Sequence, residues 1–584
     1  MCPAIRKILD DSAEHPRFIE TAYGGGYRYM GPLAEVCEFE PSSAEIEQVR
    51  GVKIVVEEEE IENAAPTPRE VAILHSPTLT LSAPKLMVRT KALVIGMGVV
   101  ALAGIAVLIA YRARIRPSPT GTTPPHSIAV LPLRNLTGDA ANDYLSDGIT
   151  ESLIAALSKV EGLKVISPGS VFTYRGRQVD PRQVGRELNV ATVLDGSVRK
   201  SGETVRVDAT LASAEDGRVL WASDSSDRAF GDIFAVQENI ARNVAVGLML
   251  SLSGEAFQRL TSRSTENNEA YQAYLKAEYF LNKRSPDGLQ QAREYFDQAI
   301  KEDPQYALAY AGLSQYYIMA IWFTANTPPL EALEKAKATA RKAVEIDDAL
   351  TEAHIALASA DGNDWDLWDS VRESARAIEL SPGSSEAHHT HAYALLDVGR
   401  TDEAIAEIKK AQQLDPLSIV MSTDVGELLL YARRYDEAIA ALKTVFERDP
   451  GRQNANWDLG EAYRHKSMFD AAAAEYLQAK ALNGESQDTI AALQSAYATS
   501  GMQGFWQKEL ELALEKAKRG YFSSFTIARF YARLGERDRA LEWMEKAYRE
   551  HSPGLLYMLH DPDLDELHSD PRFLDLLRRT GLVS

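Results

Sequence analysis

The chain has 584 residues, which is enough for several domains. Its formal net charge of −21 argues against nucleic-acid binding by the protein as a whole. Its only two cysteines are Cys2 and Cys37, so a disulfide framework and a cysteine-based metal site are excluded from the long C-terminal remainder.

Residues 1–34 contain the end of a helix and a predicted hairpin. Phe18–Thr21 and Tyr27–Met30 alternate between apolar and polar residues, as strands do, and Gly24–Gly26 supplies the turn between them. The run IRKILDD, PRFIET and GGGYRYMGPL resembles the last part of the winged-helix DNA-binding domain of OmpR-like regulators. The strands and helices that precede this part in that family are missing from the sequence. We therefore interpret residues 1–34 as a partial winged-helix domain.

The winged-helix resemblance implies DNA as a partner only if the missing N-terminal part of the domain exists. Arg6, Lys7 and Arg28 are then the candidate DNA contacts. The alternative is that all three are solvated surface charges.

A hydrophobic stretch divides the chain. Residues 35–91 are acidic and rich in proline, which is typical of a flexible linker. Ala92–Tyr111 carries no charge and is long enough to cross roughly 30 Å of hydrocarbon as a helix. We predict a single transmembrane helix there; a buried helix of a soluble core is the alternative. Its small residues four positions apart could pack against a second copy of the helix, so a homodimer is possible.

The charges beside Ala92–Tyr111 do not assign its orientation, because three basic residues lie on each side. The winged-helix resemblance implies a cytoplasmic N-terminus. We therefore expect a single-pass protein of the bacterial inner membrane, with the long C-terminal region in the periplasm. Residues 112–126 are a second short linker.

Residues 127–255 predict an α/β module. Ser127–Leu133 and Gly162–Pro168 are candidate strands separated by a helical pattern, and three further strands follow between residues 190 and 222. The phrases SIAVLPLRNLTGD and VGRELNVATVLDGSVRKSGETVRVDATL resemble the domain at the start of TolB and in FlgO-like proteins. That module recurs behind membrane helices in CadC-like regulators and beside the cyclase domains of bacterial adenylate cyclases. The resemblance implies a binding role without catalysis.

Residues 265–551 repeat with a period of 34. Prolines recur at 382, 416 and 450, and alanines recur at 404, 438 and 472. This period and the small residues within it are typical of tetratricopeptide repeats, whose helix pairs stack into a superhelix with a concave groove. We expect a protein or peptide partner in that groove. Residues 485–522 fit the frame poorly, and residues 552–584 predict a cap over the last apolar face.

Two clusters in the array suggest metal chemistry. His388, His389 and His391 lie on one helix, and His354 precedes His388 by one repeat, so zinc is one reading and repeat equivalence is the other. Four aspartates surround Trp365 and Trp368, but their spacing does not match a calcium loop. For that segment we predict a turn between two repeat helices, with both tryptophans in the core. We expect no metal site, no cofactor and no catalytic residue.

Together these features predict a multidomain chain with a partial winged helix, one transmembrane helix, an α/β module and an all-α repeat superhelix. The sequence resembles membrane-anchored regulators of the CadC/ToxR type. We expect a signalling or transcriptional regulator that binds protein or peptide partners and is not an enzyme. The alternative is a membrane-anchored interaction scaffold with no role in DNA binding.

Overall fold

The structure is a computed structural model, and it describes residues 19–22, 26–29, 126–202, 204–223, 228–229, 233–248, 264–323 and 329–583. The predicted transmembrane stretch Ala92–Tyr111, the two linkers except for His126, Arg6 and Lys7 lie outside these residues. No helix within the described ranges is both long enough and apolar enough to span a membrane. The chain divides into two compact units, residues 1–111 and 112–584, which we describe separately.

The first unit contains the predicted hairpin. Strands β1 (Ile19–Ala22) and β2 (Gly26–Tyr29) pair antiparallel, with Ile19 opposite Tyr29. Arg28, the third candidate DNA contact, lies in β2 opposite Glu20. The sequence therefore located these two strands to within a residue.

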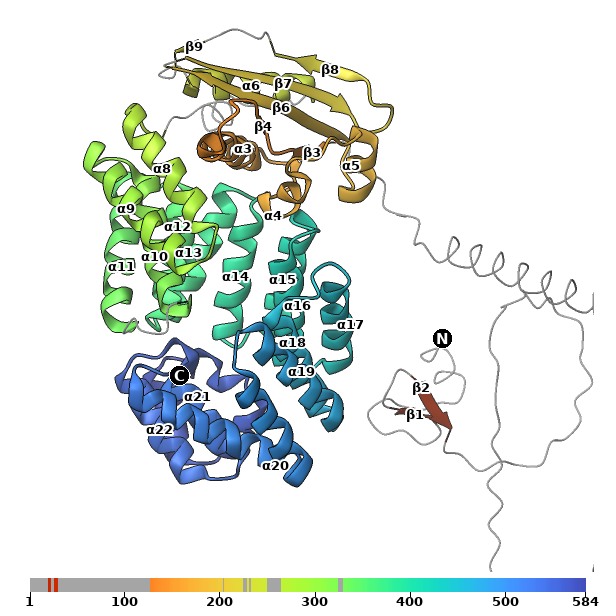
Figure 1. The fold of residues 1–584 in the computed structure, drawn as a ribbon, viewed down its shortest axis with the longest axis vertical. Helices are drawn as coiled ribbons and strands as arrows, with labels where there is room; N and C mark the ends of the chain where they lie inside the picture. Colours follow the sequence, from red (N-terminus) through yellow and green to blue (C-terminus); the bar gives the residue numbers. More distant parts are fainter. Residues whose placement is uncertain are drawn as a thin grey trace, which may run out of the picture. The chain divides into compact units, whose positions relative to one another are not determined.

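The second unit begins with a mixed sheet (Figure 1). Its strands follow the order β5-β3-β6-β7-β8; β3 pairs in parallel with β5 and β6, whereas β7 pairs antiparallel with β6 and β8. Two short strands pair with interior strands of this order, β4 with β6 and β9 with β7. The strands are β3 (Ser127–Val130), β4 (Arg134–Asn135), β5 (Lys164–Val165), β6 (Thr192–Ser201), β7 (Thr204–Ser213), β8 (Val219–Ala222) and β9 (Arg228–Ala229).

Helices pack on this sheet because their apolar sides match its buried strands. Helix α3 contacts α6 as well as β3 and β6, and α6 also contacts β7 and β8. The helices of the module are α3 (Asp143–Ser158), α4 (Pro168–Val171), α5 (Pro181–Leu188) and α6 (Ile233–Gly247). The predicted α/β arrangement of strands and helices is therefore present in the described part of this region.

The rest of the unit is an array of antiparallel helix pairs stacked in sequence order (Figure 1). Its helices are α8 (Asn268–Leu281), α9 (Pro286–Glu302), α10 (Ala307–Phe323), α11 (Pro329–Ile346), α12 (Thr351–Asn363), α13 (Leu367–Leu380), α14 (Ser385–Asp397), α15 (Thr401–Leu414), α16 (Ile419–Tyr431), α17 (Tyr435–Phe446), α18 (Gln453–His465), α19 (Phe469–Leu482), α20 (Gln487–Arg519), α21 (Ser524–Arg533) and α22 (Arg537–Arg549).

Small residues at repeat-equivalent positions let the helices of a pair approach closely. A Cβ atom on Gly426 would lie 2.5 Å from Leu442, and one on Gly460 would lie 2.7 Å from Tyr476. Gly460 follows Gly426 by one 34-residue period, and Tyr476 follows Leu442 by the same interval. The periodic alanines at 404, 438 and 472 are likewise fully buried. The repeat pattern therefore encodes the packing of the array, and the predicted all-α superhelix is confirmed.

The poor frame of residues 485–522 does not interrupt the repeats. Helix α20 contains a break at Ser500 and Gly501, where Gly501 has a φ of +60°. Gly501 follows Ser467, another residue with positive φ, by one period. The two halves of α20 therefore turn at the position where the preceding helix pairs turn, although the residues themselves depart from the consensus.

The α/β module and the array share buried contacts. Ser170 at the end of α4 donates a hydrogen bond to Asp415 (2.5 Å), and the same hydroxyl accepts one from the backbone N–H of Leu417. Burial raises the pKa of Asp415 to about 6, although its hydrogen bonds with Ser170 act in the opposite direction. Asp415 therefore fixes the loop after α15 against α4.

The C-terminal part of the chain consists of two 3-10 segments and a helix, η4 (Pro553–Leu559), η5 (Pro562–Leu567) and α23 (Pro571–Arg579). Leu555, Met558 and Leu564 are fully buried and belong to the same apolar core as α21 and α22. That residues 552–584 cap the array stays a prediction. The segment also reaches earlier repeats, because His560 Nε2 lies 2.7 Å from the carbonyl oxygen of Leu396 in α14.

Candidate functional site: an acidic cavity on the repeat array

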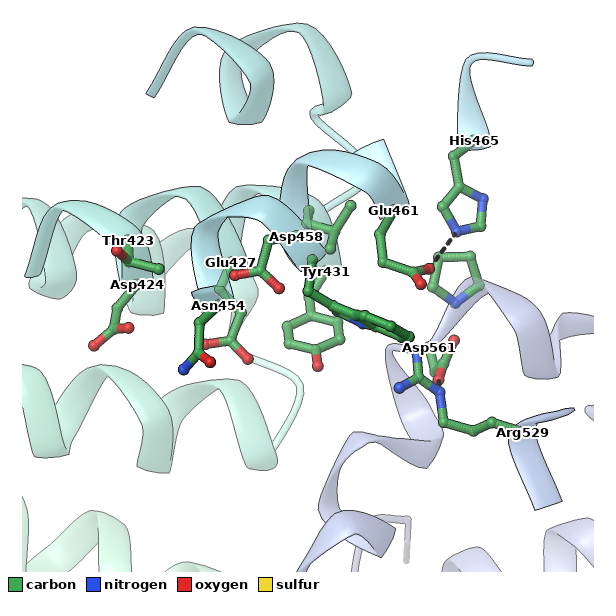
Figure 2. A pocket seen from close by; sticks show the side chains of 13 residues that line it. Thr423, Asp424, Glu427, Tyr431, Asn454, Asp458, Glu461, His465, Arg529 and Asp561 are labelled. Atoms are coloured by element: carbon green, nitrogen blue, oxygen red, sulfur yellow. Dashed lines mark ion pairs between the residues drawn. The ribbon is translucent and has the colours of Figure 1, made fainter. Parts of the chain in front are cut away.

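A cavity of about 250 Å³ lies between α16, α18 and the C-terminal part of the chain (Figure 2). Figure 2 shows the residues of α16 and α18 on one side and Arg529 with Asp561 on the other. The lining residues are Thr423, Asp424, Glu427, Leu430, Tyr431, Asn454, Trp457, Asp458, Glu461, His465, Arg529, Asp561 and Pro562. The cavity therefore lies between two consecutive repeats and the C-terminal segment that contains Asp561 and Pro562.

The carboxylates of the first wall occupy equivalent positions in two repeats. Asp424 and Glu427 of α16 precede Asp458 and Glu461 of α18 by one 34-residue period. Residues three apart lie on the same face of a helix, so each helix presents one aspartate and one glutamate to the cavity. The repeat thus places the same pair of acids twice on one surface.

At the α18 end the acid is fully neutralised by arginines. Glu461 lies 2.7 Å from Nη2 of Arg464 and 2.7 Å from Nη2 of Arg533, and it accepts a hydrogen bond from Tyr476. Arg533 also pairs with Asp563 at 2.6 Å. Burial alone would raise the pKa of Glu461, but the charges of Arg464 and Arg533 hold it well below its usual range. Glu461 is therefore an ionised member of a buried network.

The acids at the α16 end have different partners. Among the described residues, no lysine or arginine forms an ion pair with Asp424, Glu427 or Asp458. Asp424 contacts the ring of His389 (2.8 Å), and Glu427 accepts a hydrogen bond from the hydroxyl of Tyr393 (2.7 Å). Glu427 and Asp458 therefore have no ion pair with a lysine or arginine among the described residues, although the charge of Arg529 also acts on Asp458.

The pKa values reflect this difference. Burial and the nearby charge of Asp424 raise the pKa of Glu427 to about 7. Burial and the charge of Glu427 raise the pKa of Asp458 well above its usual range. Both shifts have the sign expected for carboxyl groups that crowd together away from water. Burial and crowding therefore favour the protonated forms of Glu427 and Asp458 over their ionised forms more than water does.

The arrangement suits a cationic group. Five carboxyl groups line the cavity, and Arg529, the one guanidinium among its described lining residues, is paired with Asp561 at 2.5 Å. His465 does not add a charge at neutral pH, because burial and the charge of Arg464 lower its pKa to about 4. Trp457 and Tyr431 add aromatic surface, on which ammonium and guanidinium groups pack favourably.

The histidines that suggested zinc have other partners. His354 lies 2.7 Å from Glu373 and 2.9 Å from the carbonyl oxygen of Asp348. His388 makes the equivalent contacts one repeat later, with Glu407 and the carbonyl oxygen of Pro382. Among the described residues, no group of three or more His, Cys, Asp or Glu side chains is arranged to hold a metal ion. Repeat equivalence therefore accounts for the spacing of these two histidines.

The aspartate cluster around Trp365 surrounds a lysine. Lys337 of α11 forms ion pairs with Asp361 (3.1 Å), Asp364 (2.7 Å) and Asp366. The predicted turn between two helices is present, and Trp365 packs on Tyr548 and His551. The prediction that both tryptophans lie in the core is wrong for Trp368, which is 64% exposed. Trp368 lies at the start of α13, on the side that faces solvent.

Sequence reasoning missed the cavity, although a signal for it was present. The pairs Asp424/Asp458 and Glu427/Glu461 follow the same period as the prolines and alanines. A polar residue that recurs with the repeat lies on a fixed face of the superhelix, so the recurrence marks a shared surface. The opposite wall carried no such signal, because Arg529 and Asp561 lie outside these two repeats.

Comparison with known families identifies the repeats. Residues 385–416 and 424–486 each match a family model described as a tetratricopeptide repeat. The second match contains all four carboxylates of the α16 and α18 wall. Tetratricopeptide repeats indicate a scaffold for protein–protein interaction, so a protein or peptide is the class of partner that the array suggests.

A curated relative contradicts the expectation that the chain is not an enzyme. The chain is 35% identical over 254 residues to the putative adenylate cyclase 3 of Rhizobium meliloti (strain 1021). The match covers 43% of this chain and 43% of the relative, so the chain spans less than half the length of that protein. Our expectation rested on the lack of a recognisable catalytic motif, and that lack is not evidence against catalysis. The relative instead points to an enzyme.

Several solved structures resemble parts of the chain. They include YrrB, a tetratricopeptide protein with an unusual peptide-binding site (19% identity; 35% of this chain and 98% of that one; TM-score 0.25). PilF of Pseudomonas aeruginosa aligns with 18% identity (40% and 99%; TM-score 0.29), and TTC0263 of Thermus thermophilus with 17% identity (33% and 99%; TM-score 0.29). TM-scores of this size do not establish a common overall shape.

Proposed function

We propose that the repeat array binds a partner protein and that the cavity beside Asp424, Glu427 and Asp458 receives a lysine or arginine side chain of that partner. One observation carries the proposal. Glu461 holds the guanidinium of Arg533 at 2.7 Å, whereas its repeat equivalent Glu427 faces a cavity in which no described lysine or arginine pairs with it. The same position on the same face thus binds an arginine in one repeat and is available to bind one in the other.

The energetics support this assignment. A cation placed between Glu427 and Asp458 would offset their mutual repulsion and allow both carboxyl groups to ionise. A buried charge-assisted hydrogen bond to a guanidinium is also about twice as strong as a neutral one. Binding therefore recovers free energy that the crowding of these acids costs the unbound chain.

The test uses two peptides that differ only in charge. We expect the full-length chain to bind a short acetylated peptide of alternating arginine and alanine, and to bind the glutamate counterpart weakly or not at all. The substitutions Glu427→Gln and Asp458→Asn preserve shape and together remove the charge of the open end. Together they should lower the affinity for the arginine peptide by about tenfold or more, which corresponds to a loss of about 1.4 kcal/mol in binding free energy.

Glu447→Gln is the matched control. Glu447 lies at the exposed end of α17, outside the cavity lining, so its loss should leave the peptide affinity unchanged. Equal weakening by Glu447→Gln would show that only the overall negative charge attracts the peptide. Binding that survives in the Glu427→Gln, Asp458→Asn variant would place the peptide elsewhere.

The resemblance to the putative adenylate cyclase supports a second proposal, that the chain acts in nucleotide-cyclase signalling. Incubation of the purified full-length chain with ATP and a divalent cation, followed by measurement of cyclic AMP, tests this directly. Cyclic AMP formation that requires the chain would support the proposal. A rate equal to that of the buffer alone would contradict catalysis by this chain under those conditions.

A membrane-anchored regulator with a periplasmic array also remains a proposal. The uncharged stretch Ala92–Tyr111 supports it, and the candidate contacts Arg6, Lys7 and Arg28 support a DNA output. A reporter that is active only in the periplasm, fused after Ser584, should be active. Activity of a cytoplasmic reporter at the same position would contradict the orientation.

A further inference from the structure

The chain itself places a guanidinium beside the cavity, and the contacts of that group show how this surface holds a cation. The side chain of Arg533 is only 2% exposed. Its Nη2 lies 2.7 Å from Glu461, and its Nε lies 2.6 Å from Asp563. Its Cζ also lies over the ring of Trp506, at 4.1 Å from the ring centroid. One internal arginine thus bridges two carboxyl groups and packs on an indole.

The two carboxyl groups that Arg533 bridges belong to different elements. Glu461 lies in α18, whereas Asp563 lies in η5. A guanidinium suits such a pair, because it is planar and donates from several nitrogens in fixed directions. Arg464 bridges the same two acids, with its Nη2 at 2.7 Å from Glu461 and 2.6 Å from Asp563. Both cations that bridge this pair are therefore arginines.

The array uses lysine in a different setting. Lys337 pairs with Asp361, Asp364 and Asp366, which all lie where α12 ends and α13 begins. An ammonium group is a compact point charge, so it suits acids that converge from a single turn. The contrast between Lys337 and Arg533 indicates what each cation needs. Acids of one turn suit lysine, and acids of separate elements beside an indole suit arginine.

The open cavity offers the same components as the Arg533 site. Glu427 precedes Glu461 by one 34-residue period, and Asp458 lies on the following repeat. Their carboxyl groups come from different elements, α16 and α18. Trp457, which precedes Asp458 in the chain, supplies an indole to the cavity lining and is only partly buried. The cavity therefore combines two acids from separate helices with one aromatic ring.

Arg529 lines the same cavity but holds a different acid. Its Nε lies 2.5 Å from Asp561, and Figure 2 shows these two residues on the wall opposite Glu427. The charge of Arg529 acts on Asp458 without an ion pair between the two. Glu427 therefore stays without a guanidinium among the described residues.

We propose that the cavity selects arginine over lysine: the guanidinium bridges Glu427 and Asp458, and Trp457 packs on its plane. This rests on the proposed function above and names which of the two cationic side chains the site takes. Both side chains carry the same charge, so the selection comes from shape and hydration. A guanidinium is flat, weakly hydrated and able to stack on an aromatic face, whereas an ammonium is strongly hydrated. Trp457 is thus the specificity-determining residue.

The test compares three acetylated peptides of equal length, in which alanine alternates with arginine, lysine or citrulline. Citrulline keeps the planar shape of arginine but carries no charge. We expect the full-length chain to bind the arginine peptide at least about fivefold more tightly than the lysine peptide, on the scale of one added aromatic contact and one added charge-assisted hydrogen bond. The citrulline peptide should bind weakly or not at all.

The outcomes separate this proposal from the proposed function. Equal affinities for arginine and lysine, or tighter binding of lysine, would overturn the selection of arginine and leave the cation site standing. Failure of both cationic peptides to bind would overturn both proposals. So would equal binding of the citrulline and arginine peptides, because the charge would then play no part.

Trp457→Leu tests the role of the indole. In this variant the ratio of the arginine and lysine affinities should fall to within about twofold of one. The ratio is measured within one variant, so a general loosening that weakens both peptides alike does not change it. Trp457→Phe keeps a ring beside Tyr476, which Trp457 contacts with centroids 4.9 Å apart, and should keep most of the preference.

Trp543→Leu is the matched control for Trp457→Leu. Trp543 is also partly buried against the same apolar core, but it lies outside the cavity lining. The preference for arginine should therefore be unchanged in this variant. A preference that persists in Trp457→Leu, or one that is lost equally in Trp543→Leu, would overturn the proposal.

Discussion

Glu427 and Glu461 occupy the same position in neighbouring repeats, yet their surroundings differ. Glu461 is 3% exposed and is held by two arginines, so its charge belongs to the fixed structure. Glu427 is only partly buried, faces a cavity and has a raised pKa. The comparison teaches that one repeat position serves stability where the chain supplies its own cation. Where the described chain supplies none, the same position is left for a partner.

Arg533→Ala removes one of the two arginines that hold Glu461, and it should have the largest effect on stability of the variants considered. It leaves Glu461 and Asp563 buried without one of their main cations. Removal of one partner from a buried ion pair typically costs about 3–5 kcal/mol, so the free energy of unfolding should fall by about that amount. Chemical denaturation measures it. A loss below about 1 kcal/mol would show that Arg464 alone suffices for Glu461.

Glu427→Gln, at the equivalent position of the preceding repeat, should instead raise the free energy of unfolding. The pKa of Glu427 is raised in the folded chain, so the carboxyl destabilises the fold once it ionises. This penalty is absent below the unfolded pKa of about 4.3, develops as the pH rises from there to about 7, and is constant above that. The variant should therefore gain about 1–2 kcal/mol at pH 8 and nothing at about pH 4. Thermal unfolding at both pH values measures the gain.

An equal gain from Glu427→Gln at acidic and at alkaline pH would contradict this account, because the charge would then not be its cause. The related variant Asp458→Asn should also stabilise the chain at neutral pH, since burial raises the pKa of Asp458 as well. A substitution that stabilises the chain but weakens ligand binding indicates that the original residue serves binding rather than stability.

Lys466→Ala should have the smallest effect on the free energy of unfolding. Lys466 pairs with Asp436 at 2.5 Å in the turn after α18, but the side chain of Asp436 is 84% exposed. Exposed pairs of this kind contribute between about 0 and 1 kcal/mol, so the free energy of unfolding should change by less than about 0.5 kcal/mol. A loss as large as that of Arg533→Ala would mean that proximity rather than burial decides the strength of these pairs.

The sequence predicted the array well because its information is local and periodic. The alanines at 404, 438 and 472 identify where helices pack closely, and the alternating residues on either side of Gly24–Gly26 predict two strands without any knowledge of the rest. The segment 485–522 shows the limit of this reasoning. Its residues depart from the repeat consensus. The break at Gly501 nevertheless lies one 34-residue period after the turn at Ser467, so the segment keeps the spacing of the neighbouring repeats.

The site was only half predictable. The acids at 424, 427, 458 and 461 repeat with the array and could have been found by aligning the repeats. Arg533 lies 72 residues after Glu461, and nothing in either local sequence indicates that the two meet. The path of residues 551–567 is likewise a product of tertiary packing, because His551 and Asp565 contact turns far earlier in the chain. Such contacts depend on how the last helix pair folds back.

The uptake or release of protons during peptide binding tests the central claim most directly. If a guanidinium enters the space between Glu427 and Asp458, it should drive protons off these groups, since the pKa of Glu427 lies at about 7 in the free chain. Titration calorimetry of the arginine peptide at neutral pH, in two buffers of different ionisation enthalpy, should show net proton release that Glu427→Gln reduces. Binding without proton release, or release unchanged by Glu427→Gln, would contradict the account.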